Sequence, residues 1–166
     1  MSDSDGQRES SPLSGGALRA RSKAIATWLA LLGGSLGLHR FYLHGWRDMW
    51  GWCSVPPTLL GLYGLQRARD IGLDDHLSWL LLPLLGLALA AGMLAAIVHG
   101  LTPDAAWNAR HNPAGPASGT GTGWLTVLGV ILALALGATA LMASLAFGAQ
   151  RFFEYQAETP TPSVPR

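Results

Sequence analysis

Two long stretches without any acidic or basic side chain constrain the fold of this chain most. Residues 77–98 and 124–149 contain no Asp, Glu, Lys or Arg. At about 1.5 Å of rise per helical residue, each is long enough to cross a hydrocarbon core of about 30 Å, which takes roughly 20 residues. Because the lipid interior offers no water to the backbone, a spanning stretch without sheet partners must be helical. The sequence therefore predicts membrane-spanning helices at about 77–98 and 124–150.

Two shorter apolar blocks lie nearer the N-terminus. They cover residues 24–38 and 49–66, and the seam between them contains His39, Arg40, Arg47 and Asp48. A long Arg side chain can extend toward lipid headgroups, so the first helix is expected to continue past it. These blocks predict helices at about 22–43 and 48–67. The second is expected to kink at Pro56 and Pro57, because proline lacks a backbone N–H and clashes with the preceding turn.

Together the four blocks predict an all-α membrane protein with four transmembrane helices arranged as two helical hairpins. Only 13% of the residues are charged, and these lie mostly in the tails and seams. The predicted regions are a disordered polar tail at 1–21, a first hairpin at 22–72, a second hairpin at 76–151 and a flexible tail at 152–166. The loop within the second hairpin, 99–123, is rich in Gly and Pro and is expected to be irregular and to face outward.

The distribution of Arg and Lys predicts the orientation, because short loops rich in these residues stay in the cytoplasm. With four crossings, six such residues fall on the side of both termini: Arg19, Arg21, Lys23, Arg67, Arg69 and Arg151. Three fall on the other side: Arg40, Arg47 and Arg110. We therefore expect both termini in the cytoplasm. A cleavable signal peptide is the less favoured interpretation, because the first apolar run begins only after a long polar tail.

The most distinctive short motif lies between the first two helices. It reads Gly34-Ser-Leu-Gly37-Leu-His39-Arg40-Phe41-Tyr42-Leu43, with basic residues before the first helix and Asp70 after the second. This order resembles the TM2-domain family, small membrane proteins built on two helices joined by a short seam. The resemblance covers roughly residues 22–72, about a third of the chain. It implies a multi-pass membrane protein of undefined molecular activity, similar to bacterial four-helix members, with no catalytic residues to carry over.

Two interpretations of this motif remain open. In the first, it is a structural corner at the membrane surface, where Arg40 reaches phosphate headgroups and the two aromatic residues occupy the interface. In the second, His39, Arg40 and Tyr42 form a polar patch that recognises a partner protein or a lipid headgroup. Both interpretations place the motif where the membrane meets water.

Small residues predict close helix packing in two places. Gly33 and Gly37 lie on one helical face, and Gly129, Ala133 and Gly137 recur every four residues in the last apolar block. Faces of this kind let two backbones approach closely in a membrane. The face in the last block serves either packing within the molecule or self-association.

Composition and spacing exclude several classes of function. A net charge of +1 gives no basic field for nucleic acid. His39 and His44 are five residues apart, which does not fit a metal site, and no cofactor motif is present. We expect a non-enzymatic scaffold, or a module that binds proteins or lipids, in the bacterial inner membrane. Its expected partners are the bilayer, a membrane protein or a second copy. The alternative is a small transporter or channel with the proline-kinked second helix as its gate.

Overall fold

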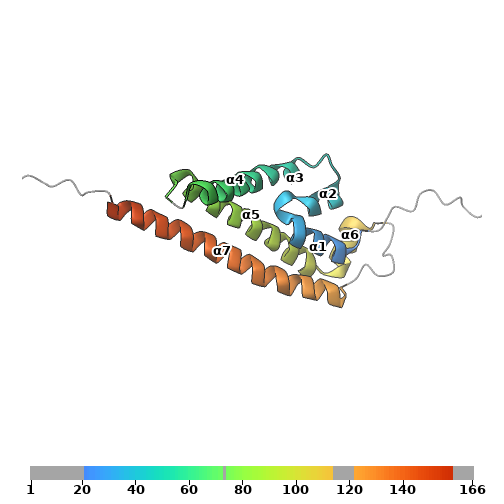
Figure 1. Ribbon diagram of the computed structural model, residues 1–166. Helices are drawn as coiled ribbons and strands as arrows, with labels where there is room; N and C mark the ends of the chain where they lie inside the picture. The colour runs from blue at the N-terminus through green and yellow to red at the C-terminus, as the bar shows by residue number, and fades with distance from the viewer. Residues whose placement is uncertain (1–20, 73, 114–121, 159–166) are drawn as a thin grey trace, which may run out of the picture.

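The computed structural model describes residues 21–72, 74–113 and 122–158, and within these ranges every regular element is a helix. The two longest are α5 (His76–Leu101) and α7 (Trp124–Glu158), which pack side by side along the length of the molecule (Figure 1). Within the described ranges these two are long and apolar enough to cross a membrane. The predicted spans at 77–98 and 124–150 are thus confirmed as apolar helices of spanning length.

The last helix is longer than the sequence predicted. Residues 152–158 were assigned to a flexible tail, yet α7 continues through them to Glu158. Arg151 donates to Glu154 at 2.8 Å and Gln150 donates to the same carboxylate at 2.9 Å, which are the spacings that stabilise a helix surface. Residues 1–20 and 159–166, which hold most of the predicted tails, lie outside the described residues.

The predicted helix at 22–43 is broken into three pieces. These are α1 (Lys23–Gly33), a single 3-10 turn η1 (Gly34–Leu36) and α2 (Leu38–His44). Gly37 joins the last two in the left-handed region, with φ of 74°, which glycine adopts without steric cost. The chain turns back there, and the Tyr42 hydroxyl accepts a hydrogen bond from the Ser22 N–H at 3.2 Å. The segment therefore begins and ends at the same end of the molecule.

The predicted helix at 48–67 is also divided. It consists of α3 (Met49–Cys53) and α4 (Val55–Ile71), so Pro56 and Pro57 lie in the first turn of a helix and do not kink a continuous one. Proline suits this position because the first N–H groups of a helix have no partner within it. From there α4 runs antiparallel to α5, and Gly61 and Gly64 on α4 let the α5 backbone approach closely.

The loop predicted as irregular at 99–123 contains a short helix, α6 (Asp104–His111), which covers one end of the bundle (Figure 1). Its Trp107 is 1% exposed and packs with Ala26 and Leu43 from the first segment. Burial of this large aromatic side chain explains why a Gly- and Pro-rich region is ordered where it contacts the bundle. Residues 114–121 of the loop lie outside the described residues.

The described ends of the chain lie at opposite ends of the bundle. Residue 21 is hydrogen-bonded to Asn112 at the end covered by α6, called here the α6 end. Glu158 closes α7 at the other end, where α5 begins (Figure 1). Two complete hairpins with both chain ends on one side do not agree with this arrangement. The reason is the turn at Gly37, which sends the first segment back before it reaches the far end.

Candidate functional site

The motif residues gather where α2 meets α3 and the middle of α5. The side chain of Arg40 on α2 donates through Nε to Asp48 Oδ2 at 2.7 Å. Asp48 is the N-cap of α3 and accepts from the Trp50 N–H through its other oxygen at 3.3 Å. The hydrogen bond from Arg40 holds the pKa of the Asp48 carboxyl below its usual range. The guanidinium is therefore fixed by an ionised partner across the α2–α3 turn.

A hollow lies between this corner and α5, called here the motif hollow. It consists of two adjoining cavities of about 280 and 320 Å³ that share His39, Arg40, Ala91 and Ala95. The small side chains of α5 make room for it, and Leu94 and Val98 form an apolar part of its wall. Asp48 does not line either cavity, so Arg40 is the only charged side chain among the lining residues.

Two imidazoles that line the hollow each have a buried ring nitrogen without a partner in the part of the chain that the structure describes. The ring centroids of His39 and His99 are 5.3 Å apart, and His39 is 7% exposed. His39 Nδ1 and His99 Nε2 are buried and have no hydrogen-bond partner among the described residues. A buried polar atom without a partner carries a desolvation cost, so such atoms point to a bound molecule or to water. The hollow is thus polar on its α2 side and apolar along α5.

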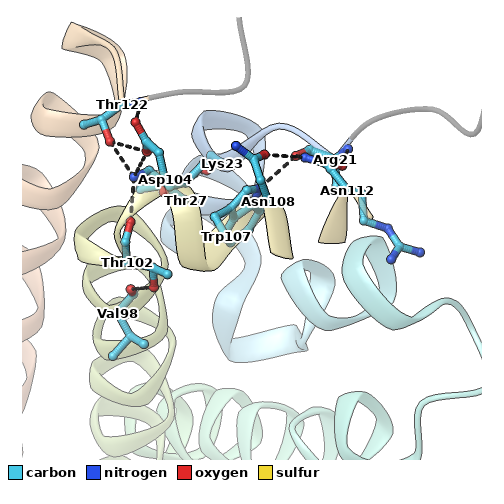
Figure 2. A network of polar contacts seen from close by, with 10 residues as sticks. All are labelled: Arg21, Lys23, Thr27, Val98, Thr102, Asp104, Trp107, Asn108, Asn112 and Thr122. Carbon is cyan, nitrogen blue, oxygen red and sulfur yellow. Dashed lines mark hydrogen bonds and ion pairs between the residues drawn. The ribbon is translucent and has the colours of Figure 1, made fainter. Parts of the chain in front are cut away.

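A second polar cluster joins the first segment to the rest of the molecule at the α6 end (Figure 2). Lys23 is 1% exposed, and its Nζ donates to the Thr102 carbonyl at 2.7 Å, to Asp104 Oδ1 at 2.6 Å and to the Thr122 hydroxyl. These three acceptors use all three ammonium protons. The hydrogen bond from Lys23, with others from Thr122, holds the pKa of Asp104 well below its usual range. A buried cation is thereby fully paired.

The chain just before α1 is held by α6. The Arg21 N–H donates to Asn112 Oδ1 at 2.7 Å, and the Arg21 carbonyl accepts from Trp107 Nε1 at 2.9 Å (Figure 2). Asn112 is 7% exposed and is itself hydrogen-bonded to Asn108. These contacts satisfy backbone groups next to a helix start, where the helix supplies no partner. The α6 end therefore fixes where α1 enters the bundle.

The remaining motif residues have separate places. Phe41 stacks on Trp46, with ring centroids 5.2 Å apart, and Leu43 is 3% exposed in the cluster with Trp107. Gly34 meets Gly92 of α5, where a Cβ added to Gly34 would lie 2.6 Å from the Gly92 Cα. Asp70 is exposed near the end of α4, far along the chain from the hollow and at the other end of the bundle. The structure does not bring Asp70 together with the motif.

The small residues predicted for packing lie at helix contacts inside the molecule, with one exception. On α7, Gly129 faces Thr27 and Trp28, Ala133 is fully buried, and Gly137 faces Met93. This face is therefore used within the molecule. Gly33, by contrast, faces Leu38 of its own segment, so the close approach to α5 is made by the next residue along.

Sequence reasoning missed the partners of the motif. Asp48 lies in the predicted seam without being a predicted site residue, and Lys23, which the sequence marks only as a charge that sets topology, is buried and paired. After the second predicted helix, the acid that forms an ion pair is Asp75, which pairs with Arg67 at 2.6 Å, whereas Asp70 is exposed. The available signal for Asp48 was its own residue type and position, because Asp is a preferred N-cap and this one directly precedes a predicted helix. Nothing local marks a residue whose partner is 81 positions away, as for Lys23.

Within the described residues, no three His, Cys, Asp or Glu side chains come together in a way that could hold a metal ion. The chain's one cysteine, Cys53, is exposed and free. The arrangement at the hollow offers a fixed guanidinium and imidazole nitrogens beside an apolar wall. Such a set can bind and orient a polar group.

Comparison with known proteins gives one match. The family model of the TM2 domain matches residues 19–65, which include α1, α2, α3 and most of α4. No curated protein and no solved structure matches the chain. The matched region ends within α4, so the family describes the motif side of the hollow, while α5 completes it.

Proposed function

Starting from a chain that contains a TM2 domain at residues 19–65, we propose that it is a multi-pass membrane protein whose role is binding, not catalysis. One observation carries the proposal. The motif residue Arg40 is held by Asp48 at a hollow lined by two imidazoles, each with a buried ring nitrogen that has no hydrogen-bond partner among the described residues. A corner that served only to turn the chain would need neither the cavity nor the unpartnered polar atoms. The partner is a membrane protein, a lipid or a second copy of the chain.

The proposed membrane arrangement has three crossings, made by α3 with α4, by α5 and by α7. The segment α1–α2 is re-entrant: it enters from the α6 end, reaches the level of Gly92 near the middle of α5 and turns back. Non-helical backbone such as that around Gly37 is tolerated at this depth because it is covered by protein. Gly37 lies against the backbone of Gly51, which supports this placement.

The charges support an orientation with the α6 end in the cytoplasm. Among the described residues, five basic side chains lie toward this end: Arg21, Lys23, Arg40, Arg47 and Arg110. Three lie toward the other: Arg67, Arg69 and Arg151. By the positive-inside rule the N-terminal side is then cytoplasmic and the C-terminal side is not. The proposed location is the inner membrane of a bacterium, on the ground of the family resemblance.

Photocrosslinking at the rim of the hollow tests the binding role. A photoreactive residue replaces Leu94, which is 61% exposed beside the hollow, or Leu145, which is 55% exposed on α7 as the control position. In membranes, we expect a discrete adduct from position 94 and none from position 145. Adding Arg40→Ala should abolish the adduct at an unchanged protein level, whereas Arg47→Ala removes an exposed charge on the same turn and should not.

Two results would count against this role. One is the same adducts from both positions, which would show contact with bulk lipid only. The other result combines two observations. The protein itself is lost from Arg40→Ala membranes, and the adduct is unchanged both in Arg40→Lys and in Ala91→Leu, which fills the hollow. Both observations together would make the motif a structural corner.

The alternative of a transporter or channel has less support. It rested on a kink in the second helix, and the prolines instead begin α4. Pro57 does line the motif hollow, so flux through reconstituted vesicles, compared between the native chain and Pro57→Ala, is the direct measurement for that role.

A further inference from the structure

We propose that the motif hollow binds the phosphate of a phospholipid headgroup, with an acyl chain lying along α5. This inference rests on the binding role proposed above and names its ligand. It requires three properties of the hollow: donors for a phosphate, no competing carboxylate, and an apolar path from the phosphate to the lipid side of the bundle.

The donors come from one charged group and its neighbours. Arg40 uses Nε for Asp48, and no described residue takes up its two terminal nitrogens. His39 lines both cavities, and His44 and His99 line the larger one. A guanidinium with free terminal nitrogens suits phosphate oxygens, since its planar fork can donate two parallel hydrogen bonds. The Nδ1 of His39 and the Nε2 of His99 are buried behind this surface, so the guanidinium is the donor on which the proposal rests.

The carboxylate that neutralises Arg40 is kept out of the cavity. Asp48 is 11% exposed and lines neither part of the hollow, and its oxygens are occupied by Arg40 and by the Trp50 N–H. It therefore fixes the guanidinium from behind. Among the lining residues a ligand therefore meets a guanidinium and no carboxylate, which favours a phosphate over an ammonium ligand.

The apolar path is provided by α5. Ala91 and Ala95 form the floor that both cavities share, and Leu94 and Val98 continue the wall of the larger cavity. Leu94 and Val98 are 61% and 56% exposed, so this wall reaches the outside of the bundle. A free phosphate would leave the apolar wall uncovered, whereas a phospholipid satisfies both sides of the hollow. The geometry therefore favours a lipid over a soluble anion.

Native mass spectrometry of the full chain in neutral detergent tests this directly. The probes are dioleoyl phosphatidic acid, dioleoylglycerol, which lacks only the phosphate, and inorganic phosphate. We expect an adduct with the phosphatidic acid at least tenfold more abundant than with dioleoylglycerol, because charge-assisted hydrogen bonds are worth about that factor. Inorganic phosphate should compete only weakly.

Three variants locate the binding. Arg40→Ala should lower the affinity for phosphatidic acid about tenfold. Ala91→Leu fills the shared floor without touching the ion pair and should lower it as well. Arg47→Ala removes an exposed charge on the same turn and should leave the affinity unchanged. Because Arg40→Ala also breaks the contact with Asp48, Arg40→Lys provides a variant that keeps the charge and should bind more strongly than the Ala variant.

Several outcomes would overturn the inference. Equal binding of phosphatidic acid and dioleoylglycerol would mean that the phosphate is not recognised, and tight competition by inorganic phosphate would point to a soluble anion. Equal loss in Arg47→Ala would indicate general surface charge. If the phosphate is not recognised, or if Arg47→Ala loses as much affinity, while the adduct from position 94 still depends on Arg40, the binding role stands and its ligand is a protein. If the lipid tests fail and the adduct from position 94 also does not depend on Arg40, the proposed binding role is contradicted as well.

Discussion

The two halves of this molecule are both helical and apolar, yet they hold together by different means. The α5–α7 pair consists of uninterrupted helices whose contact surface is made of small side chains such as Ala133 and Gly137. The first segment, α1–α2, is divided at Gly37 and is held by polar contacts, above all those of Lys23 and Arg40. Long apolar helices need only the lipid and close packing, whereas a segment that turns back inside the bundle needs specific partners for its backbone and charges.

The sharpest test of this contrast concerns topology, because its outcome is all or none. Reporter fusions before residue 21 and after residues 45 and 112 should lie on one side of the membrane, and fusions after residues 72 and 160 on the other. A complete first hairpin would instead place the fusion after residue 45 opposite the N-terminus. Cysteine labelling of intact cells at the same positions is an independent check on each fusion.

Removal of the Lys23 ammonium should have a large effect on stability. Lys23→Met leaves the Thr102 carbonyl and Asp104 without their buried partner, so we expect a loss on the order of 2 kcal/mol and earlier proteolysis around α6. Thermal unfolding in mild detergent measures the loss. Arg69→Met, which changes an exposed cation at the other end, is the control. An equal shift of the unfolding temperature in both variants would mean that Lys23 does not hold the first segment, α1–α2.

Substitution of a glycine by alanine should affect stability differently in the two halves. In Gly34→Ala the new Cβ would lie 2.6 Å from the backbone of Gly92, so a shift of α1–α2 away from α5 is expected, at a cost of about 1–3 kcal/mol. Gly148→Ala in α7 meets only Pro83 at 3.8 Å, an ordinary contact, and should be neutral or slightly stabilising because alanine favours a helix. Thermal midpoints of the two variants give the comparison. Equal midpoints would show that the close approach at Gly34 is not required.

The pH dependence should be the smallest effect. The pKa of Asp104 is lowered in the folded protein, so its carboxylate stabilises the fold above the ordinary carboxyl pKa of about 4, and this contribution is lost as the pH falls further. Asp75 behaves in the same way through Arg67. We expect α6 to become protease-sensitive below about pH 4 in the native chain. Asp104→Asn should already be sensitive at neutral pH and should change little with acid.

Much of the second half could be predicted from the sequence, and less of the first. An uncharged run such as 77–98 is expected to form a helix in lipid, so α5 could be predicted from hydropathy alone. The break at Gly37 did not, because a glycine in an apolar run is compatible with either a continuous helix or a turn. The choice depends on whether another backbone, here that of Gly51, occupies the space beside it.

The candidate site shows the same division. The motif from His39 to Leu43 is recognisable from its order, and its Arg40 lies at the motif hollow. Its partner Asp48 lies eight residues away and was within reach of sequence reasoning. His99, which completes the hollow from α5, was not, since nothing in the sequence relates it to His39 until the two helices pack.

By itself the sequence determined that this chain contains two apolar helices of spanning length and a TM2 motif at the polar seam between two shorter apolar blocks, because hydropathy and short motifs are local properties. Only the tertiary structure decided that the first segment turns back, that the described ends lie at opposite ends of the bundle, and that Lys23 is buried. Those features depend on contacts between residues far apart in the chain, such as Lys23 and Asp104, whose energies arise only once the helices are assembled.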